Sequence, residues 1–286
     1  MAVPVSLAPE ALAPYPRFSL YNSPYPAHDR GCAIDLYPDA DVAPSPVAGE
    51  VLDTRTTRAP PKPYAAEHDY LVLIDAGEYV ARVLHVQPSV AAGDRVRVGD
   101  PLGRLVRSGY FAPWVDDHVH LGFREPDANH YRASGSLPVS PAVPVTGVPW
   151  DGAGTVVETG ETYAVLDAPG HPAPGERYAA IAAADGTPLD GGLVHYGGGG
   201  ALADDPGDGV ERPVSLLGRR VGTARGRTVE WADVAVLANG ERVTGLSLAC
   251  GRDALGAKLV CPDHDLAVGD RVAVAVEPTD DPVRLG

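Results

Sequence analysis

The stretch His118-Val119-His120-Leu121-Gly122-Phe123 decides most about the fold, and it predicts a β-strand. Side chains alternate between the two faces of a strand, so His118 and His120 project together while Val119, Leu121 and Phe123 point into a core. The rise of a strand holds the two histidine Cα atoms about 7 Å apart. Paired histidines on a strand can bind a metal ion, but they also occur as solvated or hydrogen-bonded surface residues.

Short strands separated by turns are expected along the whole chain. Gly (33) and Pro (29) interrupt the sequence every few residues and leave no convincing amphipathic helix. Turn signals such as Gly93-Asp94 and Gly99-Asp100 place glycine where the chain must reverse. The sequence therefore predicts a mainly β protein. Strands are expected at 47–52, 70–75, 79–86, 95–98, 103–106 and 118–123, and then at 155–159, 163–166, 178–181, 228–237, 242–248 and 271–276.

Two domains are expected, because 286 residues can form two cores and a proline-rich stretch at 137–150 is typical of a linker. The first domain spans residues 1–145. The second spans 150–286, and its recurrent short β-type segments predict an all-β barrel or sandwich.

Acidic residues dominate the composition, with a formal net charge of -15 and only two lysines, Lys62 and Lys258, among 23 basic residues. Such a surface repels phosphate and argues against a nucleic-acid or anionic-membrane partner. It resembles the composition of cytosolic proteins from salt-accumulating halophilic archaea. The first twenty residues lack a basic segment and an unbroken apolar run, so a cytoplasmic location and three free cysteine thiols are expected.

The order of several motifs resembles the lysostaphin-type zinc endopeptidases, also called LytM-like metallopeptidases. His28 and Asp35 precede a Pro46-Val47-Ala48-Gly49-Glu50-Val51 strand; Val83-Leu84-His85, the turn 93–103 and His118–Phe123 then follow in the family's order. The resemblance covers roughly residues 17–145 and implies a lysostaphin-like β-sandwich, the duplicated hybrid motif. Residues 150–286 resemble no family that we recognise.

The resemblance implies a single zinc ion and a hydrolytic mechanism. Asp35 and His120 match zinc ligands, and His85 and His118 match the two non-ligand histidines beside the open coordination position. Zinc would lower the pKa of water towards about 7 and polarise a peptide carbonyl, while His118 or His85 takes the proton or stabilises the oxyanion. Peptide-bond hydrolysis is thus the expected activity, with a peptide or small-molecule ligand in the groove of the N-terminal domain.

The chain departs from the family pattern at the first zinc ligand, a histidine four residues before the aspartate, where this sequence has Gly31. His28 lies seven residues before Asp35, so it needs a bend or a bulge to reach the metal, which a glycine readily supplies. Three alternatives stay open: His28 reaches the metal, Cys32 or Asp29 replaces it, or the third ligand is lost. We take His28, Asp35 and His120 as the expected metal set. Without a third ligand, the domain would be a catalytically degenerate binding or regulatory module.

The other histidines carry no site in this interpretation. His68 is expected at a strand edge, and His130, His171 and His195 are expected to be solvated in loops. The segment 195–212, with four consecutive glycines and then several acidic residues, is expected to be a mobile loop.

Overall fold

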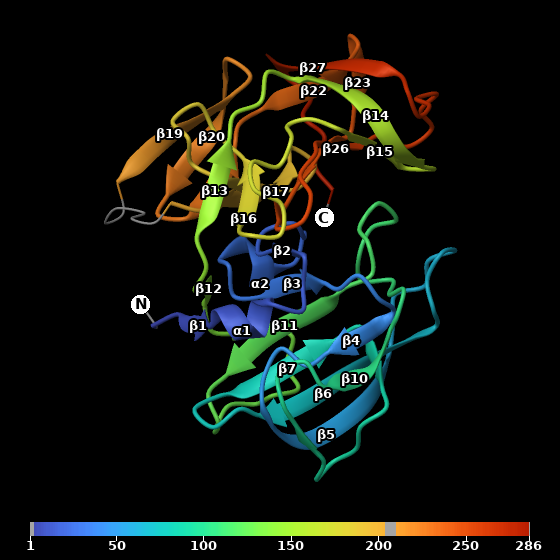
Figure 1. The fold of residues 1–286 in the computed structure, drawn as a ribbon, viewed down its shortest axis with the longest axis vertical. Helices are drawn as coiled ribbons and strands as arrows, with labels where there is room; N and C mark the ends of the chain where they lie inside the picture. The colour runs from blue at the N-terminus through green and yellow to red at the C-terminus, as the bar shows by residue number, and fades with distance from the viewer. Residues whose placement is uncertain (1–2, 204–209, 286) are drawn as a thin grey trace. The chain divides into compact units, whose positions relative to one another are not determined.

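The computed structural model describes residues 3–203 and 210–285, and it confirms a mainly β protein. Among these residues, the helices are two single turns, α1 (Pro9–Leu12) and α2 (Pro26–Asp29) (Figure 1). The chain divides into two compact units. The first contains the residues up to Phe18 together with Arg30–Val143, and the second contains Ser19–Asp29 together with the chain from Pro144 onward.

The first unit is built on an antiparallel sheet whose strands follow the order β3, β11, β7, β6, β5, β9. One face of this sheet is the core, where Val72, Ile74, Ala81, Val83 and Leu121 are fully buried. Figure 1 shows the long hairpin of β5 and β6 beside β7. The bounds are β3 (Ile34–Tyr37), β5 (Gly49–Arg58), β6 (His68–Asp75), β7 (Val80–Leu84), β9 (Arg95–Val96) and β11 (Val119–Arg124).

Smaller pairings complete the first unit. The strands β4, β10 and β8 form a three-stranded sheet, and β1 pairs with β12 in parallel. The single strand expected at 79–86 is divided, because His85, between β7 and β8, has a left-handed backbone with φ of 66°. The bounds are β1 (Val5–Leu7), β4 (Val42–Pro44), β8 (Val86–Pro88), β10 (Pro101–Leu105) and β12 (Val139–Pro141).

The second unit contains a continuous series of paired strands in the order β19, β20, β21, β18, β17, β24, β26, β15, β14, β27, β22, β23. Its core is mostly aliphatic, with Leu189, Leu246 and Leu259 fully buried. β13 pairs with β16, which pairs with β25. The bounds are β13 (Val145–Val148), β14 (Ala153–Gly160), β15 (Tyr163–Leu166), β16 (Tyr178–Ile181), β17 (Leu189–Leu193), β18 (Gly198–Ala201), β19 (Glu211–Leu216), β20 (Arg219–Arg225), β21 (Thr228–Trp231), β22 (Val234–Ala238), β23 (Glu241–Val243), β24 (Gly245–Leu248), β25 (Cys250–Gly251), β26 (Lys258–Val260) and β27 (Arg271–Pro278).

The expectation of a mobile loop at 195–212 is wrong for much of its described part. Gly198–Ala201 form β18, which pairs with both β17 and β21, and His195 is fully buried rather than solvated. Gly199 is covered without a side chain of its own, because the Trp231 ring packs where a Cβ on Gly199 would lie. Residues 204–209, which the same expectation covered, lie outside the described residues.

Two further sequence expectations can be compared with the structure. Cys32, Cys250 and Cys261 are all free, as expected. Within residues 3–203 and 210–285, no helix is long and apolar enough to cross a membrane.

Candidate metal centre

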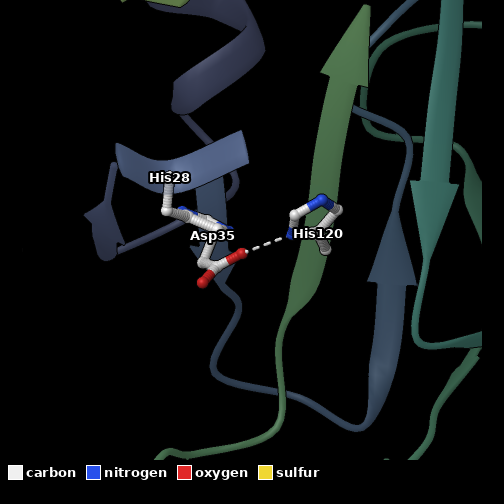
Figure 2. A group of neighbouring side chains, drawn as sticks. All are labelled: His28, Asp35 and His120. Carbon is white, nitrogen blue, oxygen red and sulfur yellow. Dashed lines mark hydrogen bonds and ion pairs between the residues drawn. The ribbon is translucent and has the colours of Figure 1, made fainter. Parts of the chain in front are cut away.

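Asp35 and His120 come together because their strands pair. β3 and β11 are antiparallel, and their register places His120 directly opposite Asp35, although 85 residues separate them in the chain. The Asp35 carboxylate is buried, and its Oδ1 lies 2.9 Å from Nδ1 of His120 (Figure 2). Sheet register thus places one imidazole and one carboxylate side by side.

His28 joins this pair to form a group that could hold a metal ion. One ligand atom each from His28, Asp35 and His120 lies within 4.8 Å of the other two, and Figure 2 shows the three side chains together. Nδ1 of the buried His28 ring lies 2.7 Å from the carbonyl oxygen of Leu20. Because a carbonyl only accepts, Nδ1 carries the hydrogen and Nε2 is the nitrogen that can bind a metal.

The local backbone explains how His28 comes into reach. His28 lies in the single turn α2, and Gly31 follows with φ of 60°, a left-handed conformation that favours glycine. The sequence analysis left His28, Cys32 and Asp29 open as third ligand. The group found among the described residues contains His28 and neither of the other two.

His118 lies beside the same carboxylate. It immediately precedes β11 and is buried, with Nδ1 2.8 Å from the carbonyl oxygen of Asp116 and Nε2 3.5 Å from Oδ1 of Asp35. Burial lowers the pKa of His118 to about 4, although the negative charge of Asp35 acts in the opposite direction. The ring is therefore neutral near pH 7, with the hydrogen on Nδ1 and a lone pair on Nε2.

His85 lies on the other side of His118. Their ring centroids are 5.1 Å apart, and the centroid of His120 is 5.7 Å from that of His85. Nδ1 of His85 lies 2.6 Å from Oδ2 of Asp69, which is completely buried. The structure thus brings all five sequence-predicted site residues, His28, Asp35, His85, His118 and His120, into one neighbourhood.

Two neighbours of these histidines were not singled out in the sequence. Asp69 adjoins the predicted strand 70–75, where a lone aspartate ordinarily faces solvent, and its burial shows only in three dimensions. The Phe111 ring packs against His118 and His85, with centroid separations of 4.6 and 5.2 Å. No sequence motif marks Phe111, because its role depends on packing alone.

The donor set can hold a metal ion. It consists of two imidazoles and one carboxylate on side chains that are almost inaccessible to solvent, with only His120 partly exposed. Nitrogen and oxygen donors of this kind suit divalent transition metals, and three protein ligands leave coordination positions for water and substrate. The fold and the site thus define a two-unit, β-rich protein with a candidate metal centre.

Comparison with known families assigns the chain more narrowly. Residues 6–141 match the model described as the N-terminal domain of a domain of unknown function (DUF8155), and residues 146–277 match its C-terminal domain. The chain belongs to this DUF8155 family, because the two matches follow one another along it and together cover most of its length.

The other comparisons add little. A structure described as the NMR solution structure of lysostaphin matches with 13% sequence identity and a TM-score of 0.27, covering 84% of this chain and 89% of that chain. This similarity is too low to support an argument about fold or function. A comparison with curated proteins found no match.

Proposed function

We propose that the N-terminal domain, residues 6–141, is a zinc-dependent hydrolase of the metallopeptidase type that cleaves peptide bonds. The observation that carries the proposal is the group of His28, Asp35 and His120, whose ligand atoms lie within 4.8 Å of one another. Two histidines and one carboxylate are the protein ligands of several catalytic zinc sites, which keep a position open for water. The motif order resembling lysostaphin-type endopeptidases supports the same proposal.

The chain's own residues supply proton transfer. Zinc, when bound, supplies a Lewis acid that acidifies water and polarises a carbonyl. His118 is neutral near pH 7 and donates Nδ1–H to the Asp116 carbonyl, so Nε2 is free to accept a proton beside Asp35. His85 makes a corresponding contact, with Nδ1 2.6 Å from Oδ2 of Asp69. One of these imidazoles takes the proton from the attacking water at Nε2 and returns it to the leaving amine. The other can donate a hydrogen bond to the developing oxyanion when its Nε2 holds a proton taken from solvent.

The deciding experiment measures zinc content per chain after purification without added metal. We expect near-stoichiometric zinc in the wild type and its loss in His28→Ala and His120→Ala. The matched control is His68→Ala, an exposed histidine of β6 in the same N-terminal domain, which should keep the zinc. A wild type without zinc would overturn the proposal and favour a non-catalytic binding domain.

Cleavage of a mixed peptide library then separates an enzyme from a binding module. We expect His118→Ala to keep zinc and to lose about 10²–10⁴-fold in kcat, which is the usual contribution of general acid–base catalysis. Stoichiometric zinc without cleavage of any peptide would instead identify a metal-containing binding or regulatory module.

A further inference from the structure

We propose that Asp69 is a positioning residue that holds His85 with its hydrogen on Nδ1 and its lone pair on Nε2. The inference rests on the proposed function, in which His85 is one of the two imidazoles that handle protons. Among the described residues, Asp69 is hydrogen-bonded to Tyr70, His85 and Ser108, and it acts on the site through His85.

The surroundings of Asp69 are those of an ionised, buried carboxylate. Its Oδ1 accepts hydrogen bonds from the backbone N–H of Tyr70 at 2.6 Å and of His85 at 3.1 Å. Its Oδ2 accepts the Ser108 hydroxyl at 2.8 Å and lies 2.6 Å from Nδ1 of His85. Burial alone would raise the pKa of Asp69, but the hydrogen bond and the electrostatic interaction with His85, together with the hydrogen bonds from Ser108 and Tyr70, outweigh burial and lower it.

This carboxylate fixes the histidine tautomer. An ionised carboxylate can only accept hydrogen bonds, so Nδ1 of His85 must carry the hydrogen that joins them. In the neutral ring, Nε2 is then the acceptor. The same constraint on the orientation of an imidazole is known from carboxylate–histidine pairs in hydrolases.

The backbone of His85 is held by Asp69 rather than by strand pairing. β6 and β7 pair as far as Leu71 and Leu84, and the chain then turns at His85 with φ of 66°, a conformation that non-glycine residues rarely adopt. Because of this turn, the backbone N–H of His85 leaves the strand pairing, and it donates a hydrogen bond to Oδ1 of Asp69 instead. One carboxylate therefore holds both the backbone and the ring of His85.

The ring that Asp69 holds lies against the candidate metal centre. Its centroid is 5.1 Å from that of His118 and 5.7 Å from that of His120, in edge-to-face arrangements with interplanar angles of 81° and 61°. Phe111 packs edge-on at 5.2 Å and limits rotation of the ring. A purely structural Asp69 would hold the same tautomer, so the tautomer and the kcat of Asp69→Asn have to be measured together.

The test is a long-range ¹H–¹⁵N correlation spectrum of the full-length protein supplied with zinc(II), with the His85 signals assigned by their loss in His85→Gln. In the wild type, we expect Nδ1 protonated and Nε2 unprotonated. In Asp69→Asn, the carboxamide can donate to Nδ1, so the hydrogen should move to Nε2. Zinc content should be unchanged, and peptide cleavage should fall about 100-fold or more in kcat with little change in KM.

Two controls make the result specific. Ser108→Ala removes one hydrogen bond to Asp69 but keeps the carboxylate, so the tautomer should stay and kcat should change only a few-fold. Asp53→Asn, on the neighbouring strand β5, should leave both unchanged. If Asp69→Asn does not fold, Asp69→Glu replaces it. This variant keeps a carboxylate and should keep the hydrogen on Nδ1 of His85, and the wild-type spectrum still shows which nitrogen carries the hydrogen.

The failure of this inference differs from failure of the proposed function. A wild-type His85 with its hydrogen on Nε2, or an unchanged tautomer in Asp69→Asn, would overturn the positioning role even in an active enzyme. Absence of zinc or of peptide cleavage would overturn the proposed function without affecting the spectrum of His85.

Discussion

His195 shows how burial alone changes the chemistry of one side chain. Its ring is completely inaccessible to solvent and packs on Tyr196, with the ring centroids 4.5 Å apart. Burial lowers its pKa to about 3, because a charged imidazolium would lose its hydration in this core. The second unit therefore folds around a neutral histidine.

This shift predicts a dependence of stability on pH. Below about pH 6.5 the unfolded chain binds a proton that the folded chain does not bind until about pH 3. The contribution of the neutral His195 ring to the free energy of unfolding is therefore complete above pH 6.5. It is lost as the pH falls towards 3, at up to about 1.4 kcal/mol per pH unit.

Urea unfolding at pH 7, 6 and 5 measures this slope. His195→Leu should show a smaller decrease of the unfolding free energy with falling pH than the wild type, whatever its stability at pH 7. His68→Leu, at an exposed position, is the control and should keep the wild-type slope. Equal slopes in wild type and His195→Leu would show that the imidazole does not stay neutral in the fold.

At the scale of single residues, the sequence predicts the site only where a motif has a fixed spacing. His118 and His120 share a strand face, and the order of motifs adds Asp35 and His85. Asp69 could not be found in this way, because three of its four hydrogen-bond donors belong to His85 and Ser108, which are distant in the sequence, and its burial depends on their convergence.

At the scale of elements, β18 shows that a strand of three glycines and one alanine can be largely buried. Gly199 lies opposite Gly191 of β17 and Val229 of β21. A Cβ on Gly199 would overlap the Trp231 ring and approach the carbonyl oxygen of Asp190 to 2.9 Å. The aromatic side chain thus supplies the apolar surface, and the glycine supplies the space for it.

Alanine substitutions within the same glycine run test this arrangement. Gly199→Ala should lower the free energy of unfolding by about 1–3 kcal/mol, because overpacking forces the ring and the backbone to move. Gly197→Ala is the matched control, since a Cβ there meets no atom within 4 Å, and it should change stability by less than about 0.5 kcal/mol. Equal effects in denaturant titrations would mean that chain entropy rather than ring packing accounts for the glycines.

Strand positions were largely predictable, and the misses have physical causes. β15 and β16 occupy the predicted ranges, because alternating apolar residues end at turn signals. The sequence could not show that Gly198–Ala201 is a strand, since a glycine run has no side-chain pattern. It also could not show the break at His85, because no glycine or proline marks the left-handed turn there.

At the scale of the whole molecule, the order of residues along the chain differs from their grouping in space. The second unit includes Ser19–Asp29, far from the rest of its sequence. Within that unit, the fully buried carboxylate of Asp190 accepts hydrogen bonds from the Ser19 hydroxyl at 2.5 Å and from the backbone N–H groups of Leu20 and Tyr21 at 2.6 and 3.2 Å. A boundary placed near residue 145 from the sequence does not include this early segment.

The grouping predicts that residues 144–286 are incomplete as an independent domain. Without residues 19–29, Asp190 loses these three donors, and leaving a buried polar group without its hydrogen bonds costs about 1–3 kcal/mol, and more when the group is charged. We expect a fragment of residues 144–286 to be unfolded, or to melt well below the full-length chain, in circular dichroism. A synthetic peptide of residues 17–30 should raise its melting temperature, whereas a scrambled peptide should not. If the fragment melts like the full-length chain and ignores the peptide, the early segment is not an integral part of the second unit.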